Sequence, residues 1–269
     1  MIWDRYVIDQ FDSDLELSED EMHLYSRQIL LNGWDIEAQE KLKLANVLIV
    51  GCGGIGCSSA ELLARAGVGK ITLIDADQVE VSNLQRQVAF TQQDIGCFKA
   101  EVLAKRLMQI NPHIQVQSIV AKLDQDNAEQ LIAAQDLVLD GCDNFATRYL
   151  VSEISKANDA VLISASAIGF QGQLFMQDGQ SACYECLFPK QNLDNGQDDL
   201  GLRCADSGVL ATTPNVMASL QAHHALLYLG LGQTPLLEKL LLWDGLSMKQ
   251  RILAFEKDET CPSCLQNRL

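Results

Sequence analysis

The segment around residue 50 constrains the fold of this chain more than any other part of its sequence. A short apolar run, Asn46–Val50, leads directly into Gly51-x-Gly53-x-x-Gly56 and then into a helix-forming stretch, residues 58–66. In a strand–loop–helix unit, the first glycine permits a tight turn, the second lets the backbone approach a phosphate, and the third allows close helix packing. The helix N-terminus then faces an anion. We therefore expect a nucleotide at this loop.

Apolar runs and helix-period stretches alternate along most of the chain. We expect further strands at 70–74, 114–119, 137–140 and 160–164, and helices between them at 98–110, 127–134 and 144–156. Such alternation predicts right-handed βαβ units around a parallel sheet. After residue 165 the pattern changes, with strands expected at 173–177 and 240–243 and a helix at 216–229. The predicted fold class is α/β: a Rossmann-like, mostly parallel sheet with helices on both faces, continuing into an antiparallel C-terminal part.

Two segments, residues 1–18 and residues 190–208, differ from the rest of the chain. Residues 1–18 form an acidic extension, and Ser18 with Glu21 three residues later predicts the cap of a first helix, continuing over 22–31. We expect residues 19–269 to form one domain. Within it, residues 190–208 are polar and without period, which predicts a long loop of the kind that often carries function.

Net charge and hydropathy exclude several classes of function. The 269 residues include 36 acidic and 20 basic side chains, giving a net charge of −16. Nucleic acid and anionic membrane both require a basic face. No apolar run reaches the roughly 18 residues of a spanning helix, and no basic-then-apolar export signal opens the chain. We expect a cytoplasmic protein that binds neither nucleic acid nor membrane.

Four of the nine cysteines form two C-x-x-C pairs, Cys183 with Cys186 and Cys261 with Cys264. Two such pairs can supply four thiolates to one structural zinc ion, which would tie the C-terminal tail to the body of the domain as a zinc clip. A redox dithiol or chance spacing are the competing interpretations. Small buried hydrophobes are the simplest interpretation of four further cysteines: Cys52, Cys57, Cys97 and Cys142.

An acidic residue follows the glycine loop at the distance that a nucleotide site requires. Asp75 lies 19 residues after Gly56, at the end of the second predicted strand, where a carboxylate can accept hydrogen bonds from ribose hydroxyls. On these residues alone, NAD fits as well as ATP.

Several independent motifs narrow the choice of family. They are Tyr25-Ser-Arg27-Gln28, the glycine loop, Asp75-Ala-Asp77 leading to Asn83-Leu-Gln-Arg86-Gln87, Lys99, and Gly141-Cys-Asp143-Asn144. Together they resemble the HesA/MoeB/ThiF family of adenylyltransferases that activate sulfur-carrier proteins, bacterial relatives of the ubiquitin-activating enzymes. The resemblance runs from about residue 19 to residue 266, and both cysteine pairs match that family's structural zinc site.

The resemblance implies a reaction and its partners. ATP would be joined to the C-terminal glycine carboxylate of a ubiquitin-like sulfur carrier, of the MoaD type for molybdopterin or the ThiS type for thiamine, with release of pyrophosphate. The cofactors would be ATP, Mg²⁺ and one structural Zn²⁺ per chain. The chain would act as a homodimer, and a cysteine desulfurase or rhodanese would supply the sulfur.

The resemblance also assigns roles to single residues. Arg86 and Lys99 would contact the phosphates, Asp143 would hold Mg²⁺, Asp75 would bind ribose, and Arg27 would reach across from a partner subunit. Seven further residues would contact the cofactor: Gly51, Gly53, Gly54, Gly56, Asp77, Asn83 and Gln87.

Each role has a structural alternative. Lys99 and Arg27 could be ordinary surface charges, and Asp143 could cap the helix that starts near Asn144. Cys204, in the polar loop beside Arg203, could be a nucleophile, because a neighbouring cation lowers a thiol pKa. The resemblance to the thiamine-type members of the family implies that it would form a covalent sulfur link with the carrier.

Two other functions remain to be compared with this one. An NAD-dependent oxidoreductase would explain the glycine loop and Asp75, but not Arg86, Asp143 and the paired cysteines together. A zinc-stabilised adaptor that binds ubiquitin-like proteins without turnover would leave Arg86, Lys99 and Asp143 without a task.

Overall fold

One mixed sheet of eight strands runs through the whole domain. The computed structural model describes residues 16–190 and 208–266. The strand order is β3-β2-β1-β4-β5-β6-β7-β8. Neighbours from β3 to β5 are parallel, and neighbours from β5 to β8 are antiparallel. The strands are β1 (Asn46–Val50), β2 (Lys70–Ile74), β3 (Gln115–Ile119), β4 (Leu137–Asp140), β5 (Val161–Ile168), β6 (Gln171–Gln177), β7 (Lys239–Asp244) and β8 (Lys249–Ala254).

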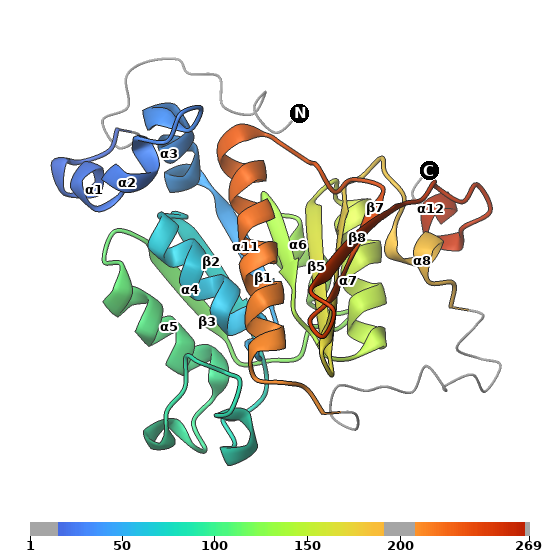
Figure 1. Ribbon diagram of the computed structural model, residues 1–269, viewed down its shortest axis with the longest axis horizontal. Coiled ribbons are helices and arrows are strands. Elements are labelled where there is room, and N and C mark those ends of the chain that lie inside the picture. Colours follow the sequence, from blue (N-terminus) through green and yellow to red (C-terminus); the bar gives the residue numbers. More distant parts are fainter. Residues whose placement is uncertain (1–15, 191–207, 267–269) are drawn as a thin grey trace.

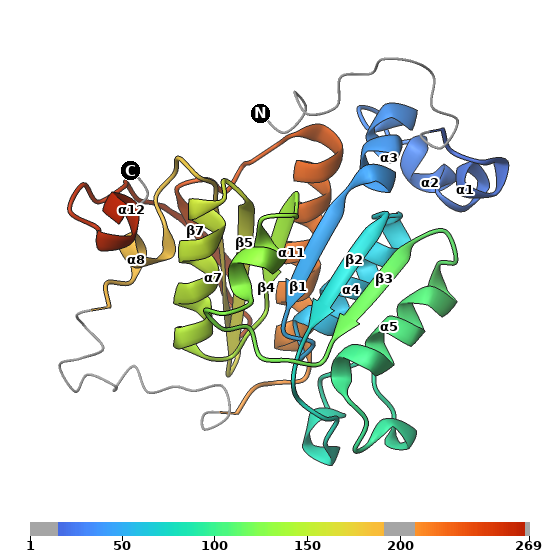
Figure 2. The ribbon, with the colours of Figure 1, turned by 180° about the vertical axis from the view of Figure 1, so that it is seen from behind.

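Helices cover both faces of this sheet. Helices α4, α5 and α11 lie on the face seen in Figure 1, and α7 lies on the opposite face seen in Figure 2. The longer helices are α3 (Asp35–Leu44), α4 (Gly56–Ala66), α5 (Lys99–Ile110), α7 (Phe145–Ala157) and α11 (Thr212–Leu231). The short ones are α1 (Glu19–Leu24), α2 (Ser26–Ile29), η2 (Val81–Asn83), η3 (Gln92–Asp94), α6 (Ala128–Ile132), α8 (Tyr184–Leu187) and α12 (Pro262–Gln266). The predicted Rossmann-like arrangement is thereby confirmed.

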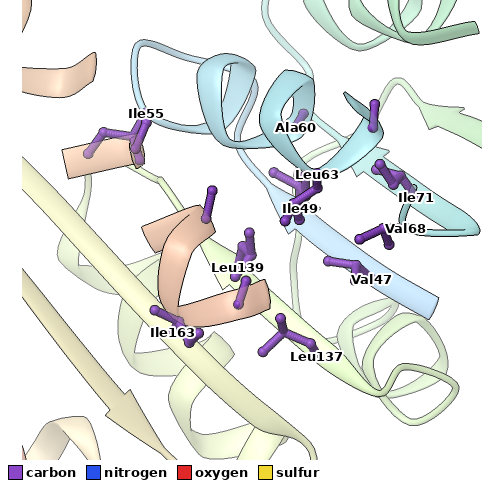
Figure 3. Packing of buried hydrophobic residues seen from close by; sticks show 14 of the residues in the cluster. Val47, Ile49, Ile55, Ala60, Leu63, Val68, Ile71, Leu137, Leu139 and Ile163 are labelled. Carbon is purple, nitrogen blue, oxygen red and sulfur yellow. The ribbon is translucent and has the colours of Figure 1, made fainter. Parts of the chain in front are cut away.

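Alternate residues of the central strands enter two separate hydrophobic clusters. On β1, Val47 and Ile49 pack into the larger cluster with α4, as Figure 3 shows, whereas Leu48 and Val50 pack into the smaller one under α6 and α7. Successive side chains of a strand point to opposite faces, so a strand covered on both sides must be apolar throughout. Each fully buried aliphatic side chain stabilises the fold by about 1.5–3 kcal/mol.

The N-terminal helices begin where the sequence predicts but do not run on as one helix. The Ser18 hydroxyl accepts from the Glu21 N–H, and the Glu21 carboxylate accepts from the Ser18 N–H, so the predicted capping box is confirmed. The expectation of continuous helix over 22–31 is wrong, because α1 ends at Leu24 and α2 begins at Ser26. The break turns Tyr25 inward, where its hydroxyl accepts from the Asn111 side chain at 2.8 Å.

Helix α11 packs on β5 and β6, where the parallel part of the sheet meets the antiparallel part. Its Gln221 side chain is fully buried, accepts from the Ser59 hydroxyl of α4 at 2.8 Å, and donates to the carbonyls of Asp140 and Ile163 at 2.9 and 2.8 Å. The helix is longer than the predicted 216–229 and ends at Leu231, capped by Gly232, whose φ of 65° is the left-handed conformation that favours glycine.

The C-terminal part differs most from the sequence prediction. Strand β5 extends to Ile168 rather than ending at residue 164, and it pairs antiparallel with β6. Strand β8 was not predicted, because all its side chains are exposed and therefore carry no apolar alternation. Within the described residues, no helix is both long enough and apolar enough to span a membrane.

Candidate active site

The glycine loop lies at the carboxyl end of β1. This strand stands between β2 and β4 in the sheet, where the chain passes from one side of β1 to the other. Gly51 has a φ of +87°, which only glycine adopts without strain. A Cβ at Gly56 would lie 1.8 Å from the Gly51 carbonyl oxygen, so the loop closes on itself only with glycine there. Gly53 has no neighbour nearer than the Gln87 amide, 3.8 Å from where its Cβ would be. The open side of the loop therefore faces the space in front of α4, as phosphate binding requires.

Asp75 holds this loop in shape. It follows β2, and its two carboxylate oxygens accept from the Cys52 N–H at 2.6 Å and the Asp77 N–H at 2.7 Å. Burial raises the pKa of Asp75, against the lowering effect of these N–H groups and of the Lys99 charge. Each oxygen retains a second lone pair, so the predicted ribose contact is compatible with this structural role.

Helix η2 and the residues after it bring the predicted polar groups beside the glycine loop. The Arg86 side chain packs its Cγ 3.6 Å from the Cβ position of Gly54, and its Nη1 donates to the Ser82 carbonyl at 3.1 Å. Asn83 is buried, and its side-chain oxygen accepts from the Glu80 N–H at 3.1 Å.

Gln87 carries an unpartnered acceptor beside the loop. Its side chain is 3% exposed, and its Oε1 has no hydrogen-bond partner among the described residues. A buried acceptor without a donor is costly. The amide nitrogen Nε2 is the atom beside Gly53, so rotation of the side-chain amide would turn Oε1 toward a nucleotide hydroxyl or amino group at the loop, which could supply that donor. The residues present therefore fit a nucleotide.

Lys99 is held by an acidic residue of the same site. Its Nζ lies 3.0 Å from Asp77 Oδ2, and its side chain is only 8% exposed whereas that of Asp77 is 67% exposed. Lys99 is also the first residue of α5. The lysine is therefore not an ordinary surface charge.

Asp143 follows β4, next to the glycine loop. The Cβ position of Gly51 lies 3.3 Å from the Gly141 carbonyl oxygen, so the two loops are in contact. Asp143 itself is exposed. The alternative that it caps the following helix is wrong: Asn144 is the N-cap of α7, and its side chain accepts from the Thr147 N–H at 2.9 Å.

Arg27 is not brought to this site within its own chain. Its neighbour Gln28 donates to the Ala66 carbonyl at 3.0 Å, at the C-terminal end of α4. The glycine loop is at the other end of this helix of 11 residues, about 16 Å away. Around Arg27 lie Leu24, Leu62 and Leu226, which line a shallow pocket. The predicted Cys204 lies outside the described residues.

The two cysteine pairs come together at the far end of the sheet, beside α8 and α12 (Figure 1). Their four sulfur atoms lie within 4.8 Å of one another, and neighbouring sulfurs are 3.5–3.7 Å apart. A tetrahedral zinc site with Zn–S bonds of about 2.3 Å places its sulfurs about 3.8 Å apart. The cluster is therefore compatible with zinc. The pairs are also linked outside the cluster, because the Ser263 hydroxyl donates to the Glu185 carboxylate at 2.5 Å. The residues forming the cluster are Cys183, Cys186, Cys261 and Cys264.

The remaining cysteines divide into two groups. Cys52 and Cys57 are buried, as expected of small hydrophobes, and burial raises the pKa of both thiols. Cys142 is half-buried and Cys97 is exposed, so the prediction of burial is wrong for Cys97. Cys97 lies in a loop and not on the packed face of a helix, and its N–H donates to the Asp94 carbonyl.

No motif in the sequence marks the buried polar residues behind the site, which are Asp140, Arg148, Ser164 and Gln221. The clearest signal was Asp140, because an acid that ends an apolar run is buried only when it is paired.

The protein belongs to the ThiF family, whose model matches residues 25–263. It is 39% identical over 261 residues to the sulfur carrier protein adenylyltransferase of Thermus thermophilus, covering 92% of both chains. It is 41% identical to the sulfur carrier protein ThiS adenylyltransferase of Escherichia coli, covering 89% of this chain and 94% of that protein. The molybdopterin-synthase adenylyltransferase of Escherichia coli is 39% identical over 93% of this chain and 99% of its own length.

A solved structure shares the fold. The crystal structure of Escherichia coli MccB with ATP superposes with a TM-score of 0.79 at 28% identity, covering 94% of this chain and 77% of that one.

Proposed function

We propose that this protein uses ATP to adenylylate the C-terminal carboxylate of a ubiquitin-like sulfur-carrier protein, with release of pyrophosphate. The observation that carries the proposal is the convergence at one sheet edge of the glycine loop, Arg86, Lys99 and Asp143. Relatives named as adenylyltransferases of ThiS and of molybdopterin synthase, each aligned over most of its length, support it. The reaction would take place in the cytoplasm, where thiols remain reduced.

The residues of the site divide the chemistry between them. The triphosphate would lie against the glycine loop at the N-terminus of α4, where backbone N–H groups of the loop would bind its oxygens. The carrier carboxylate attacks the α-phosphorus, and pyrophosphate leaves. Arg86 and Lys99 neutralise the charge that builds on the phosphates. For Lys99 this requires an exchange of partners, from the exposed Asp77 to a phosphate.

Asp143 is the residue that would hold magnesium. Mg²⁺ prefers one or two carboxylates together with phosphate oxygens, and Asp143 is an exposed carboxylate beside the glycine loop. Bound there, the ion would neutralise phosphate charge. The buried Asp140, paired with Arg148, is not available for this task.

The position of Arg27 points to a second subunit. An arginine side chain cannot span the length of α4, so Arg27 can reach a glycine loop only in another copy of the chain. The exposed apolar side chains beside it, Leu24 at 48% and Leu62 at 38%, suit a surface covered by that copy. We propose a homodimer with an arginine contributed in trans.

Mixing two inactive variants tests the shared site. A dimer of one Arg27→Ala subunit and one Asp143→Ala subunit has one complete site and one site lacking both groups. Random reassociation should restore about one quarter of wild-type exchange activity. No recovery from mixed, dimeric protein would contradict an arginine in trans.

The carrier is proposed to approach over the antiparallel half of the sheet. A hollow there is lined by Ser166, Gln173, Lys249 and Arg251, and it begins two residues beyond Ser164, which binds Asp140 beside the nucleotide site. Arg251→Glu should raise the KM for the carrier and leave the KM for ATP unchanged. An unchanged KM for the carrier would exclude this approach.

Carrier-dependent ATP–pyrophosphate exchange tests the proposed function. Zinc-loaded protein should exchange labelled pyrophosphate into ATP only when a carrier is present. Running ThiS-type and MoaD-type carriers separately also decides which type the enzyme accepts. No exchange with either carrier would overturn the proposal, and exchange by a carrier lacking its last glycine would show that the wrong carboxylate has been assigned.

Structural zinc and a separate sulfur donor complete the proposal. The four-cysteine cluster would hold one Zn²⁺ per chain, fully coordinated and therefore without a position for water. A cysteine desulfurase or rhodanese would then convert the adenylylated carrier to its thiocarboxylate. Cys204 is proposed to take part in that transfer. Cys204→Ser should keep exchange and slow thiocarboxylate formation; loss of exchange would show that its role is different.

A further inference from the structure

The carboxyl end of β4 carries a buried ion pair that takes no direct part in the proposed reaction. Asp140 is fully buried and Arg148 is 8% exposed, with Arg148 Nε 3.0 Å from Asp140 Oδ2. Burying two charges costs desolvation energy, and apolar residues of similar size often stabilise a fold as well. The pair therefore suggests a task other than stability.

Both charged side chains bind the backbone of the same residue, Cys142. Its N–H donates to Asp140 Oδ1 at 2.9 Å, and its carbonyl oxygen accepts from Arg148 Nη2 at 2.6 Å. That carbonyl belongs to the peptide bond that leads into Asp143. The plane of the peptide bond between Cys142 and Asp143 is thereby fixed.

Three further hydrogen bonds fix the pair to its surroundings. The Ser164 hydroxyl of β5 donates to Asp140 Oδ2 at 2.5 Å, and Arg148 Nη2 donates to the Ala165 carbonyl at 3.3 Å. Gln221 of α11 donates to the Asp140 carbonyl at 2.9 Å. On the far side of Asp143, Asn144 is fixed as the cap of α7. Asp143 is thus an exposed residue between Cys142 and Asn144, both of which are fixed by hydrogen bonds.

We propose that Arg148 and Asp140 are positioning residues, which orient the Asp143 carboxylate toward a divalent cation. The inference rests on the role of Asp143 in the proposed function. Misplacing a reacting group by about 1 Å can cost 100-fold in rate, so such a support is worth its desolvation cost. Arginine is required because one planar group must donate to Asp140, Cys142 and Ala165 together, which a lysine ammonium on a flexible stem cannot reproduce.

The test is Arg148→Lys, which keeps the positive charge and removes the planar guanidinium group with its several donors. Its matched control is Arg106→Lys on α5, which alters another arginine–carboxylate pair, Arg106 Nε to Glu61 Oε2 at 3.0 Å, away from the site. The first readout is Mn²⁺ binding, followed by electron paramagnetic resonance in the presence of a non-hydrolysable ATP analogue. The second is the rate of hydrogen exchange at the Cys142 amide.

Arg148→Lys should raise the dissociation constant of Mn²⁺ roughly tenfold, because the Asp143 carboxylate is no longer held in one orientation. It should also speed hydrogen exchange at the Cys142 amide, because the Asp140 carboxylate that binds this amide is no longer fixed by the arginine. Arg106→Lys should change neither. Ser164→Ala, which removes one hydrogen bond to Asp140, should shift both readouts in the same direction by a smaller factor, and it serves in place of Arg148→Lys if that variant does not fold.

Wild-type Mn²⁺ binding in a folded variant with faster Cys142 exchange would overturn the inference and leave the proposed function intact. Slow, wild-type exchange at the Cys142 amide would also overturn it, since the backbone is then held by other groups. If Asp143→Ala itself leaves Mn²⁺ binding unchanged, the role of Asp143 in the proposed function fails first, and this inference fails with it.

Discussion

The parallel half of the sheet, β1 to β5, and the antiparallel half, β6 to β8, carry different parts of the proposed function. Parallel strands end at one edge, so Gly51 after β1, Asp75 after β2 and Asp143 after β4 meet there although they are far apart in the sequence. Antiparallel strands share no such edge. The second half instead offers one face, and its end is closed by the four-cysteine cluster.

The residues proposed for the chemistry and the contacts that support the fold therefore lie in different halves of the sheet. Nucleotide-binding groups depend on loop geometry at the edge of the parallel half. The antiparallel half depends on side-chain packing and on a clip between distant segments. Variants in one half should therefore leave the property of the other half intact, and each prediction below tests that separation.

The largest effect is expected at Gly56. A Cβ there would lie 1.8 Å from a backbone oxygen of Gly51, which cannot move without opening the loop. Gly56→Ala should destabilise the protein by more than about 3 kcal/mol and abolish ATP binding. Chemical unfolding and isothermal titration measure both. In contrast, Gly53→Ala has room for its methyl group and should fold normally; equal stability of the two variants would refute the loop geometry.

Asp143→Ala comes next, with its effect on activity alone. Exchange should fall about 10²–10³-fold, since the carboxylate that would hold the charge-neutralising Mg²⁺ is removed. Because Asp143 is exposed, the midpoint of unfolding should not change. Asp126→Ala, at another exposed acid, is the control and should keep full exchange. A fall of less than threefold in Asp143→Ala would contradict the assignment.

Loss of the cysteine cluster should affect the antiparallel half alone. Cys264→Ser should release zinc and destabilise the protein by about 2–4 kcal/mol, because the tail is no longer tied to α8. ATP binding by the folded fraction should persist. Metal content, unfolding and ATP affinity are measured together, with the exposed Cys97→Ser as control. Wild-type stability in metal-free protein would show that the cluster is not a clip.

The smallest effect is expected at His224 on α11, which packs against both halves. Burial, and then the charge of His223, lower the pKa of His224 from 6.5 to about 4. Between these values the unfolded state binds more protons than the folded state, so stability rises with pH up to 6.5 and falls as pH drops toward 4. Allowing for solvent screening, the loss should be about 1–2 kcal/mol.

His224→Gln removes this titration and should flatten the pH dependence of the unfolding free energy between pH 4 and pH 6.5. An equal slope in wild type and His224→Gln would mean that other groups govern this joint between the halves.

The sequence predicted the parallel half almost residue by residue, since β1, β2 and β4 have the bounds expected from their apolar runs. Strands buried on both faces leave an unmistakable pattern. Strand β8 escaped because an exposed edge strand has no such pattern, and the break at Tyr25 escaped because it depends on a hydrogen bond to the distant Asn111.

For the site, motifs indicated which residues matter but not what holds them. Asp75 was predicted from its spacing and Lys99 from the family resemblance, yet their partners, the Cys52 N–H and Asp77, emerge only from the folded chain. The support of Asp143 by Arg148 is a contact between separate elements, which one sequence does not encode in any local pattern.

At the edge of the parallel half, the enzyme is proposed to transfer an adenylyl group to a carrier protein. The most direct test is mass spectrometry of a ThiS-type or MoaD-type carrier after incubation with the enzyme, ATP and Mg²⁺. We expect a carrier heavier by one adenylyl group at its C-terminal glycine, formed by the wild-type enzyme and not by Asp143→Ala. An unmodified carrier of each type, with wild-type enzyme that binds ATP, would contradict it.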